Sequence, residues 1–304
     1  MSYSAVVAQY STLSRIARIA EDQWGLITRR QAENAGVSQA TLQRLAKTGI
    51  LDRVAHGVYR LTGAPPPDYL GLRAAWLQLA PEVPAWERTP DQGVVSHRSA
   101  AALYGLGHLP ADRHEFTLPE RRQSRRSDVR LHHRAVRPGE WIVLHGMPVT
   151  RPSRIAADML DDKEDPEAVA QVIVDALRPV YDYPGAFADA LAPYAASFGL
   201  RRGDGLALLR WLLDTAGDPE TSRWIEEARA HLERSAGKDG ESPAVLRVEA
   251  SVDDRRSFIR KPLCLPAGSH RQAQGSGLPE PLDAPATPAA DGVRPAAGAP
   301  LPRR

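Results

Sequence analysis

Hydrophobic residues between Leu13 and Ala20 recur at the spacing of an α-helix, with charged residues between them. This pattern predicts an amphipathic first helix, which Trp24 and Gly25 would end. Two shorter segments of helical periodicity follow, and we expect helices at 29–35 and 39–48. The start of the chain therefore predicts three helices in close succession.

Polar residues and glycines mark the ends of the two short helices. Thr28 and Ser38 precede them as N-caps, because their side-chain oxygens can accept hydrogen bonds from free N–H groups of the first turn. Gly36 and Gly49 follow them as left-handed helix stops. The turn between the helices is only residues 36–38, which is typical of a helix-turn-helix.

The segment after the third helix predicts a β-hairpin. Residues 51–55 and 58–61 are rich in strand-forming side chains and flank the dipeptide His56-Gly57. A helix-turn-helix followed by such a hairpin is the order of elements in a winged helix. In that arrangement one helix enters the major groove of DNA while the hairpin contacts the flanking backbone.

The third helix has one polar side that carries no acid. Leu42, Leu45 and Ala46 form its apolar stripe, and the other side is small, amide or cationic. Arg and Lys suit phosphate or guanine, and Gln suits the edge of adenine, so this side is typical of a DNA reader. The residues that we expect to contact DNA in this part of the chain are Thr28, Arg29, Arg30, Ser38, Gln39, Gln43, Arg44, Lys47, Arg53, His56 and Arg60. The alternatives are a small helical domain with a solvated polar face and a winged helix that binds only proteins.

After residue 62 the pattern predicts a small mixed or antiparallel sheet with helices, and then a helical region. The expected strands are 115–118, 129–133, 140–144 and 147–149. The expected helices are 68–79, 97–106, 154–160, 168–177, 186–196, 204–214 and 219–232. Ser96 stands where a cap of the helix at 97 belongs. The helix at 204–214 is apolar nearly all round, which predicts that it is buried.

These elements predict an α+β protein in three parts. Residues 1–62 form the winged helix-turn-helix, and residues 63–235 form a second domain with the sheet and the helical region. Residues 236–304 are rich in Pro, Gly and Ala with little periodicity, which predicts a disordered tail.

Charge is distributed unevenly along the chain, although the net charge is only +2. Residues 1–62 hold 8 Lys or Arg against 4 Asp or Glu, a net charge of +4. Residues 151–235 hold 10 against 16, a net charge of −6. The basic end coincides with the expected DNA reader, whereas we expect the acidic region to face solvent or a protein partner.

A second basic segment lies between the first two expected strands of the sheet. Residues 113–137 carry 8 arginines and 3 acids. Two interpretations stand equally: a loop that adds phosphate contacts to those of the wing, and a solvated hairpin loop. In the first interpretation the contacting residues are Arg121, Arg122, Arg125 and Arg126.

Three blocks of sequence resemble a known family. The motifs at 25–28, 35–38 and 57–59 (Gly-Leu-Ile-Thr, Ala-Gly-Val-Ser and Gly-Val-Tyr) resemble the N-terminal winged helix of AbiEi-type antitoxins, a group of bacterial transcriptional regulators. Residues 95–106 and 146–160 resemble two further blocks of such proteins. The resemblance covers about residues 11–162 and is loose from there to 235.

The resemblance implies a function and partners. Such antitoxins repress their own operon by binding inverted repeats in promoter DNA. They also counter a nucleotidyltransferase-like toxin in a type IV system, in which toxin and antitoxin need not form a stable complex. Antitoxicity is a property of the C-terminal region in that family. Because chains with this N-terminal part also occur fused to other modules, repression carries over to this chain more directly than antitoxicity does.

Enzymatic function is the other class to consider. Similar N-terminal regions occur joined to a Vsr-like endonuclease domain, whose site needs clustered carboxylates on a metal and a nearby Lys. The acidic run at 161–165 is the nearest candidate, but it follows a helix with no strand to present it, so we favour a solvated charge cluster. No Walker loop, dinucleotide fingerprint or Gly-x-Ser-x-Gly turn is present. We therefore expect no catalysis.

Metal ligands and cofactors are not expected from the motifs. Six histidines are concentrated between residues 97 and 145, but without cysteine and without the tight spacing that zinc sites commonly show. Adjacent His132 and His133 should point to opposite faces of a strand. The single cysteine, Cys264, excludes a disulfide framework, and no apolar run has membrane-spanning length. A cytoplasmic location is the resulting expectation.

Overall fold

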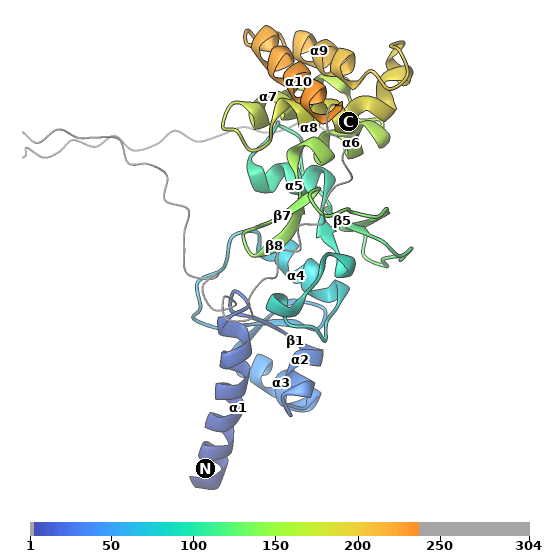
Figure 1. Cartoon of the computed structure of the whole chain (residues 1–304). Helices are drawn as coiled ribbons and strands as arrows, with labels where there is room; N and C mark the ends of the chain where they lie inside the picture. Colours follow the sequence, from blue (N-terminus) through green and yellow to red (C-terminus); the bar gives the residue numbers. More distant parts are fainter. Residues whose placement is uncertain (1–2, 237–304) are drawn as a thin grey trace, which may run out of the picture. The chain divides into compact units, whose positions relative to one another are not determined.

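Residues 3–61 fold into three helices and a small antiparallel sheet (Figure 1). The helices are α1 (Tyr3–Glu21), α2 (Arg29–Asn34) and α3 (Gln39–Lys47), and the strands are β1 (Leu26–Thr28), β2 (Leu51–Ala55) and β3 (Val58–Leu61). Strand β3 lies between β1 and β2 and is antiparallel to both. This arrangement confirms the winged helix-turn-helix, with the β2–β3 hairpin as the wing. Strand β1 is an addition that the sequence pattern did not indicate.

The predicted caps and stops of the two short helices are confirmed. The Thr28 hydroxyl accepts from the backbone N–H of Gln31 at 3.1 Å, and the Gln31 side chain accepts from the N–H of Thr28 at 3.0 Å, which makes a capping box. The Ser38 hydroxyl accepts from the N–H of Thr41 at 3.2 Å. Gly36 follows α2 with a φ of 76°, a conformation that costs glycine little.

The sheet of the winged helix packs on both faces. Ile27 and Tyr59 point into a cluster with Leu42 and Leu45 of α3. Leu26 and Val58 point the other way, because side chains alternate along a strand, and join the larger core of the following residues. One small sheet is therefore shared by two hydrophobic clusters. The division at residue 62 into separately folding domains stays a prediction.

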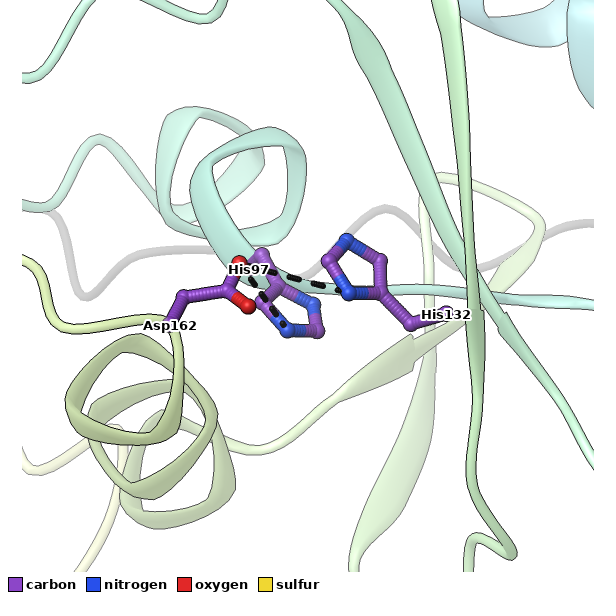
Figure 2. A group of neighbouring side chains, drawn as sticks. All are labelled: His97, His132 and Asp162. Carbon is purple, nitrogen blue, oxygen red and sulfur yellow. Dashed lines mark ion pairs between the residues drawn. The ribbon is translucent and has the colours of Figure 1, made fainter.

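A five-stranded mixed sheet follows, with the strand order β6-β5-β4-β8-β7. Its strands are β4 (Val94–Val95), β5 (His114–Leu118), β6 (Val129–His133), β7 (Trp141–Leu144) and β8 (Met147–Thr150). The pairs β4–β8 and β5–β6 are parallel, and β4–β5 and β7–β8 are antiparallel. The edge strand β6 places His132 beside His97, at the start of α5 (His97–Tyr104) (Figure 2).

The basic segment between β5 and β6 is not a hairpin loop, and that interpretation was wrong. A hairpin joins antiparallel strands, whereas β5 and β6 are parallel, with His114 opposite Val129. Residues 119–128 must therefore run back along the sheet to the end at which β5 begins. We call these residues the basic crossover. On the way they contact the end of α4 (Leu70–Leu79), where Arg122 donates to the Leu79 carbonyl at 2.9 Å.

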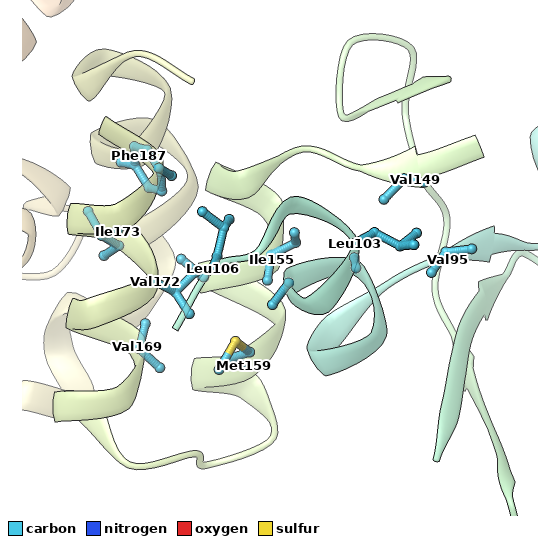
Figure 3. Packing of buried hydrophobic residues seen from close by; sticks show 14 of the residues in the cluster. Val95, Leu103, Leu106, Val149, Ile155, Met159, Val169, Val172, Ile173 and Phe187 are labelled. Carbon is cyan, nitrogen blue, oxygen red and sulfur yellow. The ribbon is translucent and has the colours of Figure 1, made fainter. Parts of the chain in front are cut away.

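The remaining elements of the described part of the chain are helices. Between α4 and β4 lie the 3₁₀ helices η1 (Ala85–Glu87) and η2 (Pro90–Gln92); after β8 come α6 (Pro152–Asp161), α7 (Pro166–Leu177), α8 (Pro184–Leu191), the 3₁₀ helix η3 (Ala192–Phe198), α9 (Gly205–Thr215) and α10 (Thr221–Ala236). Helices α5 to α8 share one apolar core with β4 and β8, and Figure 3 shows Leu106, Met159 and Ile173 within it.

The expectation that helix α9 is buried holds for one side of the helix only. Leu208, Leu209, Leu212 and Leu213 are inaccessible to solvent. Trp211 lies on the opposite side, 40% exposed, and packs against Phe198. Hydrophobicity alone does not show which apolar residues of a helix lie on its exposed side.

The structure, a computed structural model, describes residues 3–236. The tail predicted to be disordered lies outside the described residues from position 237 onward. Within the described part, no helix has the length and apolar character needed to cross a lipid bilayer.

The contact between α8 and α9 leads to a stability prediction. A Cβ on Gly205 would lie 1.9 Å from the backbone oxygen of Ala188, so Gly205→Ala must push the two helices apart. We expect a loss of about 2–3 kcal/mol in the free energy of unfolding, as for other overpacked cores. Urea denaturation measures it. Gly71→Ala in α4 is the control, since its Cβ would meet only the tip of the His114 ring at 3.0 Å; an equal loss in both variants would contradict the prediction.

Candidate nucleic-acid interface

The outer side of α3 is polar and uncommitted. Gln43, Arg44 and Lys47 are exposed, and their side chains have no hydrogen-bond or ion-pair partner among residues 11–235, whose side chains the structure describes. Leu42 and Leu45 fasten the helix to the core from the other side. The apolar stripe predicted from the sequence is thus buried, and the predicted polar side faces outward.

A hollow of about 640 Å³ separates α3 from the wing. Its walls come from the start of α2, the outer side of α3 and the hairpin, and its lining residues are Arg29, Gln39, Gln43, Ala46, Lys47, Arg53, His56, Gly57 and Tyr59. Three cations and no acid line it. Such a concave, positively charged surface suits an anionic backbone that passes between helix and wing.

Two side-chain hydrogen bonds hold polar groups in place around this hollow. Arg29 donates to the Gln39 side-chain oxygen at 3.0 Å and lies 3.4 Å from Glu33. On the wing, Arg53 and the His56 ring nitrogen are 3.2 Å apart. Gln39 and Arg53 therefore have restricted rotamers before any ligand arrives, which lowers the entropy that binding must overcome.

Three of the expected contact residues are engaged elsewhere. Thr28 is buried, and besides capping α2 its hydroxyl donates to the Pro81 carbonyl, so Thr28 is a structural residue. Arg60 contacts Asp52 at 2.8 Å and holds the pKa of that carboxyl below its usual value, so its charge is neutralised locally. Ser38 is exposed, but its hydroxyl caps α3. Thr28 and Arg60 are removed from the set of contact residues.

The basic crossover lies next to the wing. The Gln78 side chain donates to the backbone oxygen of His56 and also accepts from Arg126. Arg126 is further paired with Asp128, and Arg122 is bound to α4, so these two arginines are largely committed. Arg121 and Arg125, in contrast, are exposed and contact no acid in the described part of the chain.

Two buried glutamines, which sequence reasoning missed, hold the winged helix in place. Gln23 and Gln31 exchange two hydrogen bonds through their side-chain amides, of 2.8 and 3.0 Å. Gln31 also donates to the Val83 carbonyl at 3.1 Å, and Gln23 accepts from the N–H of Ala85 at 2.9 Å. A Thr-x-x-Gln capping box at 28–31 was the available signal for Gln31, but nothing in the sequence marked Gln23.

A second polar cluster lies at the edge strand β6 of the five-stranded sheet. His97, His132 and Asp162 come together there from α5, β6 and the end of α6 (Figure 2). Burial, helped by His132 and neighbouring arginines, lowers the pKa of His97 to about 2. His133 is exposed and points away, as predicted from strand alternation. The acidic run at 161–165 is therefore not wholly solvated. The expectation was wrong for Asp162, which contacts Arg130 at 3.0 Å, and for Glu164, which contacts Arg98 at 2.6 Å.

Ser96 occupies the N-cap position of α5 but does not cap it with its side chain. Its hydroxyl accepts from Thr117 at 2.8 Å and contacts the His97 ring at 2.9 Å. A carboxylate oxygen of Glu115 accepts from the N–H of Arg98 instead, at 3.0 Å. The predicted cap is thus supplied by a residue from β5.

The position of Thr28 allows a test of its structural role. Thr28→Val removes the cap of α2 and leaves the Pro81 carbonyl without its donor, so we expect about 1–3 kcal/mol lower stability. DNA affinity, measured where the variant is fully folded, should be unchanged. Ser38→Ala, at the exposed cap of α3, is the control and should lose only about 1 kcal/mol. Wild-type stability of Thr28→Val would contradict the structural role.

The comparison with curated proteins finds no match to the chain. The comparison with family models matches residues 14–62 to a family described as "Transcriptional regulator, AbiEi antitoxin". The matched segment begins within α1 and ends directly after β3, so it coincides with the winged helix described above. The winged helix-turn-helix of this chain, residues 14–62, therefore matches the AbiEi antitoxin family of transcriptional regulators.

Proposed function

We propose that this protein is a repressor that binds double-stranded DNA through α3 and the wing, and that its target is the promoter of its own operon. The observation that carries the proposal is that Gln43, Arg44 and Lys47 are exposed on α3 beside a hollow lined by cations. In such a complex α3 occupies the major groove and the wing follows the adjacent backbone.

The residues divide into readers and anchors. Gln39 and Gln43 lie on the side of α3 that faces the hollow and suit base edges. Lys47 and Arg53 line the same hollow and suit phosphates, which position the protein without reading sequence. Arg44, exposed on α3, is the side chain best suited to guanine.

The basic crossover extends this surface beyond the wing. Gln78 joins the wing turn to Arg126, so Arg121 and Arg125 are held on an adjoining part of the molecule. Their exposure supports further phosphate contacts, which is the first of the two interpretations of this segment.

Antitoxicity, the second part of the proposal, is assigned to residues 63–235. The region 151–235 has a net charge of −6, which disfavours DNA and suits a protein surface. Val180, Tyr181 and Tyr183 are exposed between α7 and α8, at 75%, 46% and 44%.

A nucleotidyltransferase-like toxin encoded beside this gene is the partner that the family resemblance implies, and a neighbouring gene of that kind is the simplest check. The protein acts without catalysis, in the compartment that holds the promoter DNA.

The first test concerns the outer side of α3. Arg44→Ala and Lys47→Ala should each weaken binding to the upstream promoter fragment roughly tenfold in a mobility-shift assay, because each removes one charged contact. For Lys47→Ala the slope of log K against log salt should also fall by about 0.9, the value for one phosphate contact.

Arg202→Ala is the matched control, since Arg202 is an exposed cation of the acidic region. Unchanged affinity in both α3 variants would contradict the assigned face. Absence of any DNA binding by the wild type at low salt would favour a winged helix that docks a protein instead.

The second test concerns the basic crossover. The double variant Arg121→Ala, Arg125→Ala should weaken binding to specific and unrelated DNA by the same factor, because phosphate contacts carry no sequence information. Affinity equal to that of the wild type on both DNAs would show that the crossover is only a solvated surface.

A further inference from the structure

Three side chains converge at a junction that the winged helix does not use. His97 begins α5, His132 lies on the edge strand β6, and Asp162 follows α6 (Figure 2). One potential ligand atom from each lies within 4.8 Å of the other two. Parallel pairing of β5 with β6 is what carries His132 to this place.

Each imidazole has one nitrogen occupied and the other turned toward Asp162. The Nδ1 of His97 contacts the Ser96 hydroxyl at 2.9 Å, and its Nε2 lies 3.8 Å from the Asp162 carboxylate. The Nε2 of His132 contacts Glu115 at 3.4 Å, and its Nδ1 lies 4.0 Å from the same Asp162 oxygen. Metal-binding histidines commonly have this second hydrogen bond to a carboxylate or hydroxyl, which orients the ring.

We propose that His97, His132 and Asp162 form a binding site for a divalent transition-metal cation of the Zn²⁺ class. Two imidazole nitrogens and one carboxylate oxygen make a donor set that suits such ions. The side chains of His97, His132 and Asp162 are only 7%, 13% and 19% exposed, so the proposed site is largely shielded from water. Ser96 and Glu115 are positioning residues.

Binding requires a defined local rearrangement. The two rings are stacked, with centroids 3.5 Å apart and planes at 13°. Metal–nitrogen bonds of about 2.0–2.1 Å lie near the plane of each ring, so the rings must turn about their Cβ–Cγ bonds to share one ion. Neutral imidazole is the form that binds a metal ion.

Arg130 is the group that the cation displaces. Its guanidinium lies 3.0 Å from Asp162 and 3.6 Å from Glu115, and its side chain is 45% exposed on the edge strand. It can therefore swing into solvent while Glu115 keeps its contact with His132. The bound ion would join the edge of the sheet to the end of α6, two segments far apart in the sequence.

The experiment is a titration of the purified full-length protein, with any affinity tag removed, against Zn²⁺ in competition with a chromophoric chelator. The wild type should bind one ion per chain. Asp162→Asn and His132→Gln should each weaken this binding at least tenfold. The matched controls His133→Gln and Asp161→Asn alter the adjacent exposed residues and should bind as the wild type does.

Folding is checked separately, because a misfolded variant would also lose the ion. The circular dichroism and Tm of every variant are measured without metal, and Zn²⁺ should raise the Tm of the wild type but not of Asp162→Asn. Three results would each contradict the site. They are no binding of Zn²⁺ by the wild type, equal binding by Asp162→Asn, and an equal loss of binding in the controls. Arg44→Ala should keep Zn²⁺ binding, so this outcome is independent of DNA recognition.

Discussion

Two buried glutamine side chains, Gln23 and Gln31, hold the winged helix against the loop that follows α4. Each amide uses both of its N–H groups: Gln23 donates to Gln31 and to the Leu26 carbonyl, and Gln31 donates to Gln23 and to the Val83 carbonyl. A buried amide left without partners costs about 1–3 kcal/mol, so such a pair tolerates only one arrangement of the segments around it. Replacement of either glutamine would leave its neighbours unpaired.

This constraint explains how the outer side of α3 becomes available. The amide pair fixes the start of α2, and the shared sheet, with Leu26 and Val58 in one core and Ile27 and Tyr59 in the other, fixes the wing. The polar side of α3 and the wing then flank a hollow that neither core needs. A rigid support of this kind sets the position of α3, while the side chains that would contact DNA stay exposed.

Candidate site residues were predictable where local chemistry determines them. Leu42 and Leu45 dictate which side of α3 is buried, and the exposed residues follow from helix geometry. Thr28 shows the limit of prediction from local sequence. Its role as a helix cap could be predicted, but its hydrogen bond to the Pro81 carbonyl could not. Arg60 was predicted to contact DNA, but Asp52 lies opposite it because the register of β2 against β3 shifts between Arg53 and Ala55.

The sequence by itself determined the local elements: the helix-turn-helix, its caps, the wing and most strands and helices, because periodicity and turn residues act over a few positions. Only the tertiary structure decided the direction of β6, the crossover beside the wing, and the meeting of His97, His132 and Asp162. Strand direction depends on packing between residues distant in the chain, and no local pattern encodes it. The chemistry of this chain therefore lies partly in readable motifs and partly in contacts that appear only when the whole sheet is formed.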